Sequence, residues 1–173
     1  MSLSQYLKTQ ISQAYDSLDI QLDKLAAHIQ ANGLDEAVAL QWRLAPDMMN
    51  FTQQIQRVSD FSVMGHARLS GQDAPTFPDE ETTLDALRSR LAQARAFIDA
   101  VPAEALDADP EGLVSFPAGA FGEMSWPRAV YAQRFLIANV LFHTSMAYAI
   151  LRSIGVPLGK PDALGFRSAP SSP

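Results

Sequence analysis

The sequence predicts an all-α protein, a four-helix bundle with a long crossover loop before the last helix. Four segments carry apolar residues at steps of three and four, the spacing that places them on one face of a helix. Each segment is bordered by residues that start or end helices, and no segment of similar length alternates as a strand does. The 173 residues, 47% hydrophobic and 18% charged, have the composition of one globular domain. We therefore expect a single domain over residues 1–165 and a disordered tail over 166–173.

The first helix is expected over residues 2–31. Ser2 and Gln5 have the spacing of a capping box, in which each side chain bonds the backbone amide of the other. Gly33 is placed to end the helix in the left-handed conformation. The apolar face repeats over eight positions: Leu3, Leu7, Ile11, Ala14, Leu18, Leu22, Leu25 and Ile29.

The second helix is expected over residues 46–70. Pro46 fits its first turn, where a missing amide N–H costs no hydrogen bond. The apolar face includes two small residues, Ser62 and Gly65, so either a neighbouring helix approaches closely there or a cavity opens. His66 lies one place off this face, and we expect it at the surface.

The third helix is expected over residues 82–101, with Thr82 as its N-cap. The connection that follows, residues 103–124, is rich in proline and glycine. The apolar run LVSF within it fits one arm of a short hairpin. A loop of this length either packs over a functional site or covers one end of the bundle.

The last helix is expected over residues 126–154, with Ser125 as N-cap, Pro127 in the first turn and Gly155 at the end. It is apolar on nearly every side, so we expect it to be the most buried helix of the bundle.

Two polar residues, Asn139 and His143, interrupt the last helix and share a face because they are four residues apart. A buried imidazole is expected to be neutral, because burial disfavours its charged form, and its ring N–H requires a hydrogen-bond partner. The other residues expected on the face of His143 are apolar: Leu136, Val140, Ala147, Ile150 and Ile154.

Composition excludes several classes of function. The net charge is −6 without a basic patch, which argues against nucleic acid or an anionic membrane as partner. The absence of cysteine excludes disulfides, thiolate catalysis and cysteine-bound zinc. No signal peptide is evident in residues 1–30, and polar residues interrupt the apolar segment 135–151, which argues against a membrane span. We expect a cytoplasmic protein.

Two stretches, ANVLFHTSMAYAILRSIGVPLGKPDALG and WRLAPDMMNF, resemble a domain-of-unknown-function family within the DinB/YfiT-like superfamily. The resemblance extends from the first helix to about Gly165. It implies a four-helix bundle, commonly a homodimer. In much of the superfamily three histidines hold nickel or zinc, two from an HxxxH pair on the last helix and one from the second helix. Some members are thiol-dependent transferases or hydrolases.

The chain departs from this pattern. His143 matches the second histidine of the HxxxH pair, whereas Asn139 stands at the first, and no histidine stands near Gln56 or Arg57, the matching register of the second helix. An amide oxygen is a weak ligand for zinc or nickel. The resemblance therefore implies a degenerate metal site of His143 and Asn139.

Two functions follow. In the first, the chain is a small-ligand-binding or cryptic dimeric protein without a tightly bound metal, and the two polar residues are hydrogen-bonded within the core. In the alternative, it is a metal-dependent enzyme of the thiol transferase or hydrolase type that uses the cleft around His143 with nickel or zinc. The homodimer would form through exposed apolar residues off the main faces, such as Phe61, Val63 and Met64.

Overall fold

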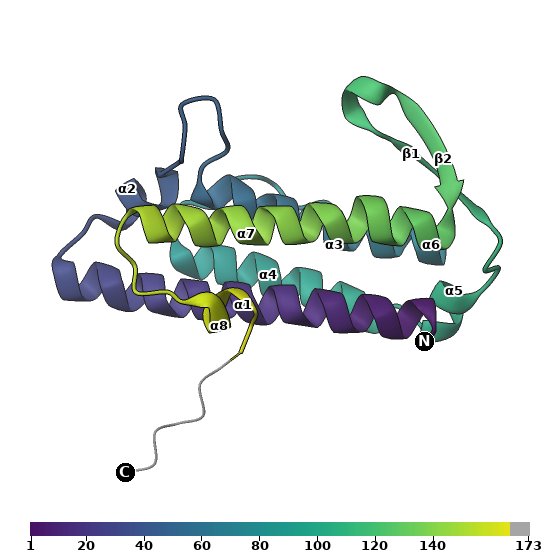
Figure 1. Cartoon of the computed structure of the whole chain (residues 1–173), viewed down its shortest axis with the longest axis horizontal. Helices are drawn as coiled ribbons and strands as arrows, with labels where there is room; N and C mark the ends of the chain where they lie inside the picture. Colours follow the sequence, from purple (N-terminus) through teal and green to yellow (C-terminus); the bar gives the residue numbers. More distant parts are fainter. Residues whose placement is uncertain (167–173) are drawn as a thin grey trace, which may run out of the picture.

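The computed structural model describes residues 1–166 and confirms the predicted four-helix bundle (Figure 1). The disordered tail expected over 166–173 lies outside the described residues from 167 onward. The four long helices lie side by side along the length of the molecule (Figure 1): α1 (Leu3–Asn32), α3 (Phe51–Ser70), α4 (Leu84–Ala100) and α7 (Ala138–Ser153).

Short elements connect and extend these helices. An antiparallel hairpin of β1 and β2 projects from one end of the bundle (Figure 1). A π-helical segment over Ala132–Ile137 joins α6 to α7, so the two form one long helix. The bounds of the short elements are α2 (Glu36–Gln41), α5 (Ala103–Asp107), β1 (Leu113–Pro117), a 3₁₀ turn (Gly119–Phe121), β2 (Glu123–Pro127), α6 (Arg128–Tyr131) and α8 (Lys160–Ala163).

The segment between α3 and α4 runs back along α3, so these two helices point in the same direction. Gln56 of α3 donates to Glu81 at 2.8 Å, and the backbone N–H of Leu84 donates to Glu36 of α2 at 2.7 Å. A buried arginine, Arg90, holds the segment in place by donating to the Pro78 carbonyl and to Glu81. The start of α4 therefore lies beside the start of α3.

Helix α3 is the most buried of the long helices, with 13 of its 20 residues inside the protein. It begins at Phe51 rather than at residue 46. Asn50 and Gln53 form a capping box there, whereas Pro46 lies in a preceding turn. A helix start needs a side chain that accepts from its free amides, and Asn50 supplies one where proline cannot. At Gly65 an added Cβ would lie 2.5 Å from Leu136, so close approach rather than a cavity explains this glycine.

The predicted ends of the other long helices need smaller corrections. The capping box of Ser2 and Gln5 and the left-handed Gly33 bound α1 as predicted. The N-cap of α4 is Thr83 instead of Thr82. Ser125 caps no helix, because it lies in β2, where its hydroxyl accepts a hydrogen bond from that of Ser115.

The hairpin confirms the prediction that LVSF forms one strand arm. Phe116 of β1 is fully buried, and its ring centroid lies 4.8 Å from that of Tyr131 and 4.5 Å from that of Phe135. These contacts attach the hairpin to the start of the last helix. The connection thus packs on the bundle instead of crossing it as an open loop.

The last helix is not the most buried one, contrary to the sequence prediction. Leu141 and Phe142 of α7 are 39% and 54% exposed, whereas the face of His143 is buried. The stretch Arg128–Ser153 is long and apolar enough to cross a membrane by length and composition alone, a property shared by core helices of soluble proteins. Here it packs against α1 and α3. Its exposed apolar face explains why the sequence looked apolar on nearly every side.

Candidate functional site

His143 lies between α7 and α3, on the buried face that the sequence predicted. Its side chain is almost enclosed, with 8% of the residue exposed. The Phe61 ring stacks on the imidazole at a centroid distance of 5.6 Å, and Phe142 meets it edge-on at 5.2 Å. Its polar neighbour is Gln54 of α3, whose Oε1 lies 2.7 Å from His143 Nδ1.

The hydrogen bonds of Gln54 determine which nitrogen of His143 carries the proton. Gln54 Nε2 donates to the Met49 carbonyl at 3.1 Å, and this contact orients the amide. Oε1 must then accept, so Nδ1 of His143 is the protonated nitrogen. Nε2 keeps its lone pair and has no hydrogen-bond partner among residues 1–166.

The imidazole is neutral at physiological pH. Burial, with a smaller contribution from the Arg57 charge, lowers the pKa of His143 to about 4. A neutral imidazole with Nδ1–H engaged can accept a hydrogen bond at Nε2 or bind a metal there.

The residues around His143 do not fit a transition-metal centre. Asn139 donates through Nδ2 to the Phe135 carbonyl at 2.7 Å, one turn back in its own helix, and bonds neither Gln54 nor His143. Within residues 1–166 no group of three or more histidine, cysteine, aspartate or glutamate side chains could hold a metal ion. Zinc sites draw three or four such ligands from the protein. The donor set here is one imidazole with two carboxamides.

The resemblance implies that the third histidine of the superfamily pattern corresponds to Gln56 or Arg57 of α3. Neither side chain is hydrogen-bonded to His143. Gln56 turns away to Glu81, and Arg57 pairs with Asp79 and Asp60 at 2.6 Å and 2.9 Å. Gln54, two residues before Gln56, is the side chain of α3 that reaches His143.

His66 is buried, which corrects the expectation that it lies at the surface. Only 2% of the residue is exposed, and its Nδ1 lies 2.7 Å from the Ser62 carbonyl oxygen. Because α3 contacts α4 as well as α7, its buried face is wider than the apolar residues alone predict. Burial lowers the pKa of His66, while the Ser62 carbonyl and the Asp99 carboxylate oppose this effect.

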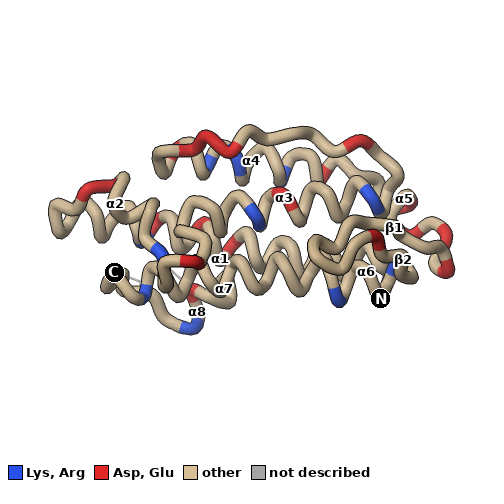
Figure 2. The backbone as a smooth tube through the Cα atoms, turned by 90° about the horizontal axis from the view of Figure 1, so that it is seen from above, with Lys and Arg blue, Asp and Glu red and all other residues tan. Residues whose placement is uncertain are grey.

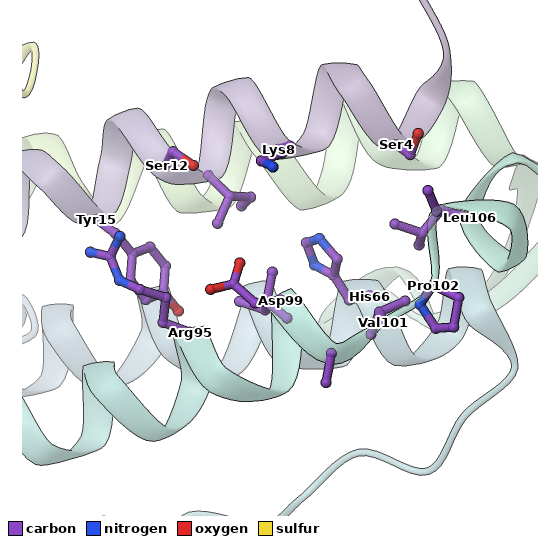
Figure 3. Close-up of a pocket in the computed structure, with 14 residues that line it drawn as sticks. Ser4, Lys8, Ser12, Tyr15, His66, Arg95, Asp99, Val101, Pro102 and Leu106 are labelled. Atoms are coloured by element: carbon purple, nitrogen blue, oxygen red, sulfur yellow. The ribbon is translucent and has the colours of Figure 1, made fainter.

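His66 lines a pocket of about 380 Å³ between α1, α4 and α5 (Figure 3). Polar residues of α1 at steps of four and two residues of α4 four apart surround this pocket, beside the apolar faces of the helices. The walls between them are apolar. The polar lining residues are Ser4, Lys8, Ser12, Tyr15, Arg95 and Asp99. Sequence reasoning missed this site, and the matched steps of four in two helices were its only signal.

Comparisons with known proteins agree with this architecture. The model of the family described as "Domain of unknown function (DUF1993)" matches residues 3–164. A crystal structure of a DinB family member protein from Shewanella denitrificans is 30% identical to the chain, with a TM-score of 0.82. The match covers 96% of this chain and 92% of that chain. No curated protein matches the chain significantly.

The low pKa of His143 makes folding stability depend on pH. The unfolded chain, with an ordinary histidine pKa near 6.5, takes up a proton at a higher pH than the folded protein does. The free energy of unfolding is therefore unaffected by protonation of His143 above pH 6.5 and decreases as the pH drops from 6.5 towards 4. We expect the wild type to lose about 1 kcal/mol more than His143→Gln between pH 7 and pH 5.5, after allowance for partial solvent screening.

Urea unfolding of both proteins at the two pH values measures this difference. His28→Gln, which alters a partly exposed histidine at the end of α1, is the control and should retain the wild-type dependence on pH. An equal pH dependence in wild type and His143→Gln would show that His143 is not held neutral by burial.

Proposed function

The chain belongs to the DUF1993 family, which has a DinB-like fold and no known function, and from this premise we propose that it is a small-molecule-binding protein rather than a transition-metal enzyme. The observation that carries the proposal is the hydrogen bond that His143 Nδ1–H donates to Gln54 Oε1. His143 is therefore engaged with an amide, and among the described residues no carboxylate and no second histidine joins it as a metal ligand.

The pocket beside His66 supports the binding part of the proposal. Its volume of about 380 Å³ lies at the small end of the range of ligand pockets. Its apolar walls bury the body of a small organic molecule, and the polar side chains between them can fix its orientation. The ligand would bind through hydrogen bonds and apolar contacts, without a metal.

A metal-dependent enzyme at His143 remains the second candidate. His143 Nε2 has no partner within residues 1–166, and Nδ1 is held by an amide oxygen, as the second nitrogen of a metal-bound histidine commonly is. The remaining ligands would have to come from a bound molecule or from a second subunit.

We also propose that the protein is a homodimer. The exposed face of α7 carries Leu141 and Phe142, and the middle of this helix carries no charge (Figure 2). The three residues that the sequence analysis assigned to the dimer interface expose less apolar surface. Val63 is buried, Phe61 is half-buried and stacks on His143, and Met64 is the exposed one of the three.

Metal analysis of the purified protein tests the choice between the two functions. We expect substoichiometric zinc and nickel in the wild type, and no change in the metal content of His143→Leu. The variant should fold with a stability change of at most about 1–2 kcal/mol, because apolar burial offsets the lost hydrogen bond. Near-stoichiometric metal that His143→Leu abolishes would make the enzyme the leading function.

The dimer is tested by light scattering. We expect twice the chain mass of 18.9 kDa for the wild type, and the single chain mass for Leu141→Glu, because an unpaired charge buried in an apolar interface costs several kcal/mol, on the order of 3–5. Leu34→Glu, at the exposed residue after α1, is the matched control and should stay dimeric. A wild type of single chain mass at high concentration contradicts the proposal.

A further inference from the structure

The pocket between α1, α4 and α5 has polar groups at its floor and rim and apolar walls. His66 and Tyr15 lie at the floor and are both at least 98% buried, with exposures of 2% and 1%. Lys8 and Asp99 lie at the rim on opposite helices (Figure 3). Pro102 ends α4 and turns the chain into α5, whose Leu106 closes one end of the pocket.

His66 offers a hydrogen-bond acceptor to the pocket. A carbonyl oxygen can only accept, so the contact with Ser62 places the proton on Nδ1. Nε2 therefore keeps its lone pair. Within residues 1–166 it has no donor, although the residue is nearly fully buried. His66 lines the pocket, so this acceptor is available to a donor group of a ligand that enters it.

Asp99 places a negative charge next to this acceptor. Its carboxylate has no ion pair within the described part of the chain, and it is near enough to His66 to act on its pKa. Figure 3 shows the carboxylate and the imidazole neighbouring one another on the side of the pocket that faces α1. An acceptor beside a free carboxylate is the environment that a ligand ammonium group requires, because each of its N–H bonds needs an acceptor.

Lys8 supplies the opposite charge across the pocket. Its ammonium group has no acidic partner among the described residues, whereas Arg95 is already paired with Asp19 at 3.0 Å and lies over the Tyr15 ring. The pocket thus has one free anion and one free cation on different helices. Ile11 and Ile98 line the apolar wall between them.

We propose that this pocket binds a small zwitterion, an α-amino acid with an apolar side chain, whose ammonium group lies at His66 and Asp99 and whose carboxylate lies at Lys8. The side chain lies against the apolar wall, including Leu106. The inference rests on the proposed function, because it specifies the ligand of the same pocket.

Calorimetric titration with three probes tests the inference. L-Leucine carries both charges, 3-methylbutylamine lacks the carboxylate, and 4-methylpentanoate lacks the ammonium group. We expect leucine to bind and each of the other two to bind about tenfold more weakly or worse, because each loses one charge-assisted contact. Equal affinity for leucine and 3-methylbutylamine, or no heat of binding with leucine at millimolar concentration, overturns the inference.

Variants at the rim locate the two contacts. Lys8→Met should weaken leucine about tenfold and leave 3-methylbutylamine unchanged, whereas Asp99→Asn should weaken both amines and leave 4-methylpentanoate unchanged. Asp85→Asn, in the first turn of α4 and outside the pocket, is the control and should bind leucine as the wild type does. Loss of leucine binding in the control, or wild-type binding in both rim variants, contradicts the assignment.

The two proposals fail separately. A stoichiometric metal at His143 would overturn the proposed function, whatever the probes do. A metal-free protein that does not distinguish the three probes would overturn only the amino-acid inference.

Discussion

The bundle depends on a requirement set by α3, whose buried polar side chains must each find a hydrogen-bond partner inside the protein. Ser59 accepts from Arg90 Nε at 2.6 Å, which ties α4 to α3. Arg90 then pairs with Asp60 and Glu81 and so fixes the segment that returns along α3. A buried guanidinium without these acceptors would be strongly destabilising, so the path of the chain between α3 and α4 follows from this one residue.

The same requirement explains the state of His143. Gln54 is buried on the α7 side of α3 and has two groups to satisfy, its N–H₂ and its carbonyl oxygen. The N–H₂ group donates to the Met49 carbonyl, so the Gln54 oxygen must accept a hydrogen bond from His143. The site is therefore built as a pair of neutral groups. The ring N–H of His143 thus has a hydrogen-bond partner without a metal, and the arrangement does not require a histidine at the position of Asn139.

The sequence predicted the number and approximate extent of the long helices because apolar spacing reports which face is buried. It was less informative about α3, where both sides are covered and polar residues such as His66 are buried with the apolar ones. The start of α3 was wrong because proline and asparagine both mark helix starts, and only the structure shows that the Asn50 side chain accepts from the Gln53 amide. The pocket beside His66 could not be foreseen, since its residues come from helices whose relative rotation no single sequence pattern gives.

The central claim is that Gln54 holds His143 as a neutral imidazole protonated at Nδ1. Nitrogen-15 NMR of the histidine ring measures this directly, since protonated and unprotonated ring nitrogens have well-separated chemical shifts. We expect that at pH 7 Nδ1 of His143 has the shift of a protonated nitrogen and Nε2 that of an unprotonated one. A proton on Nε2, or protons on both ring nitrogens at this pH, would contradict the claim.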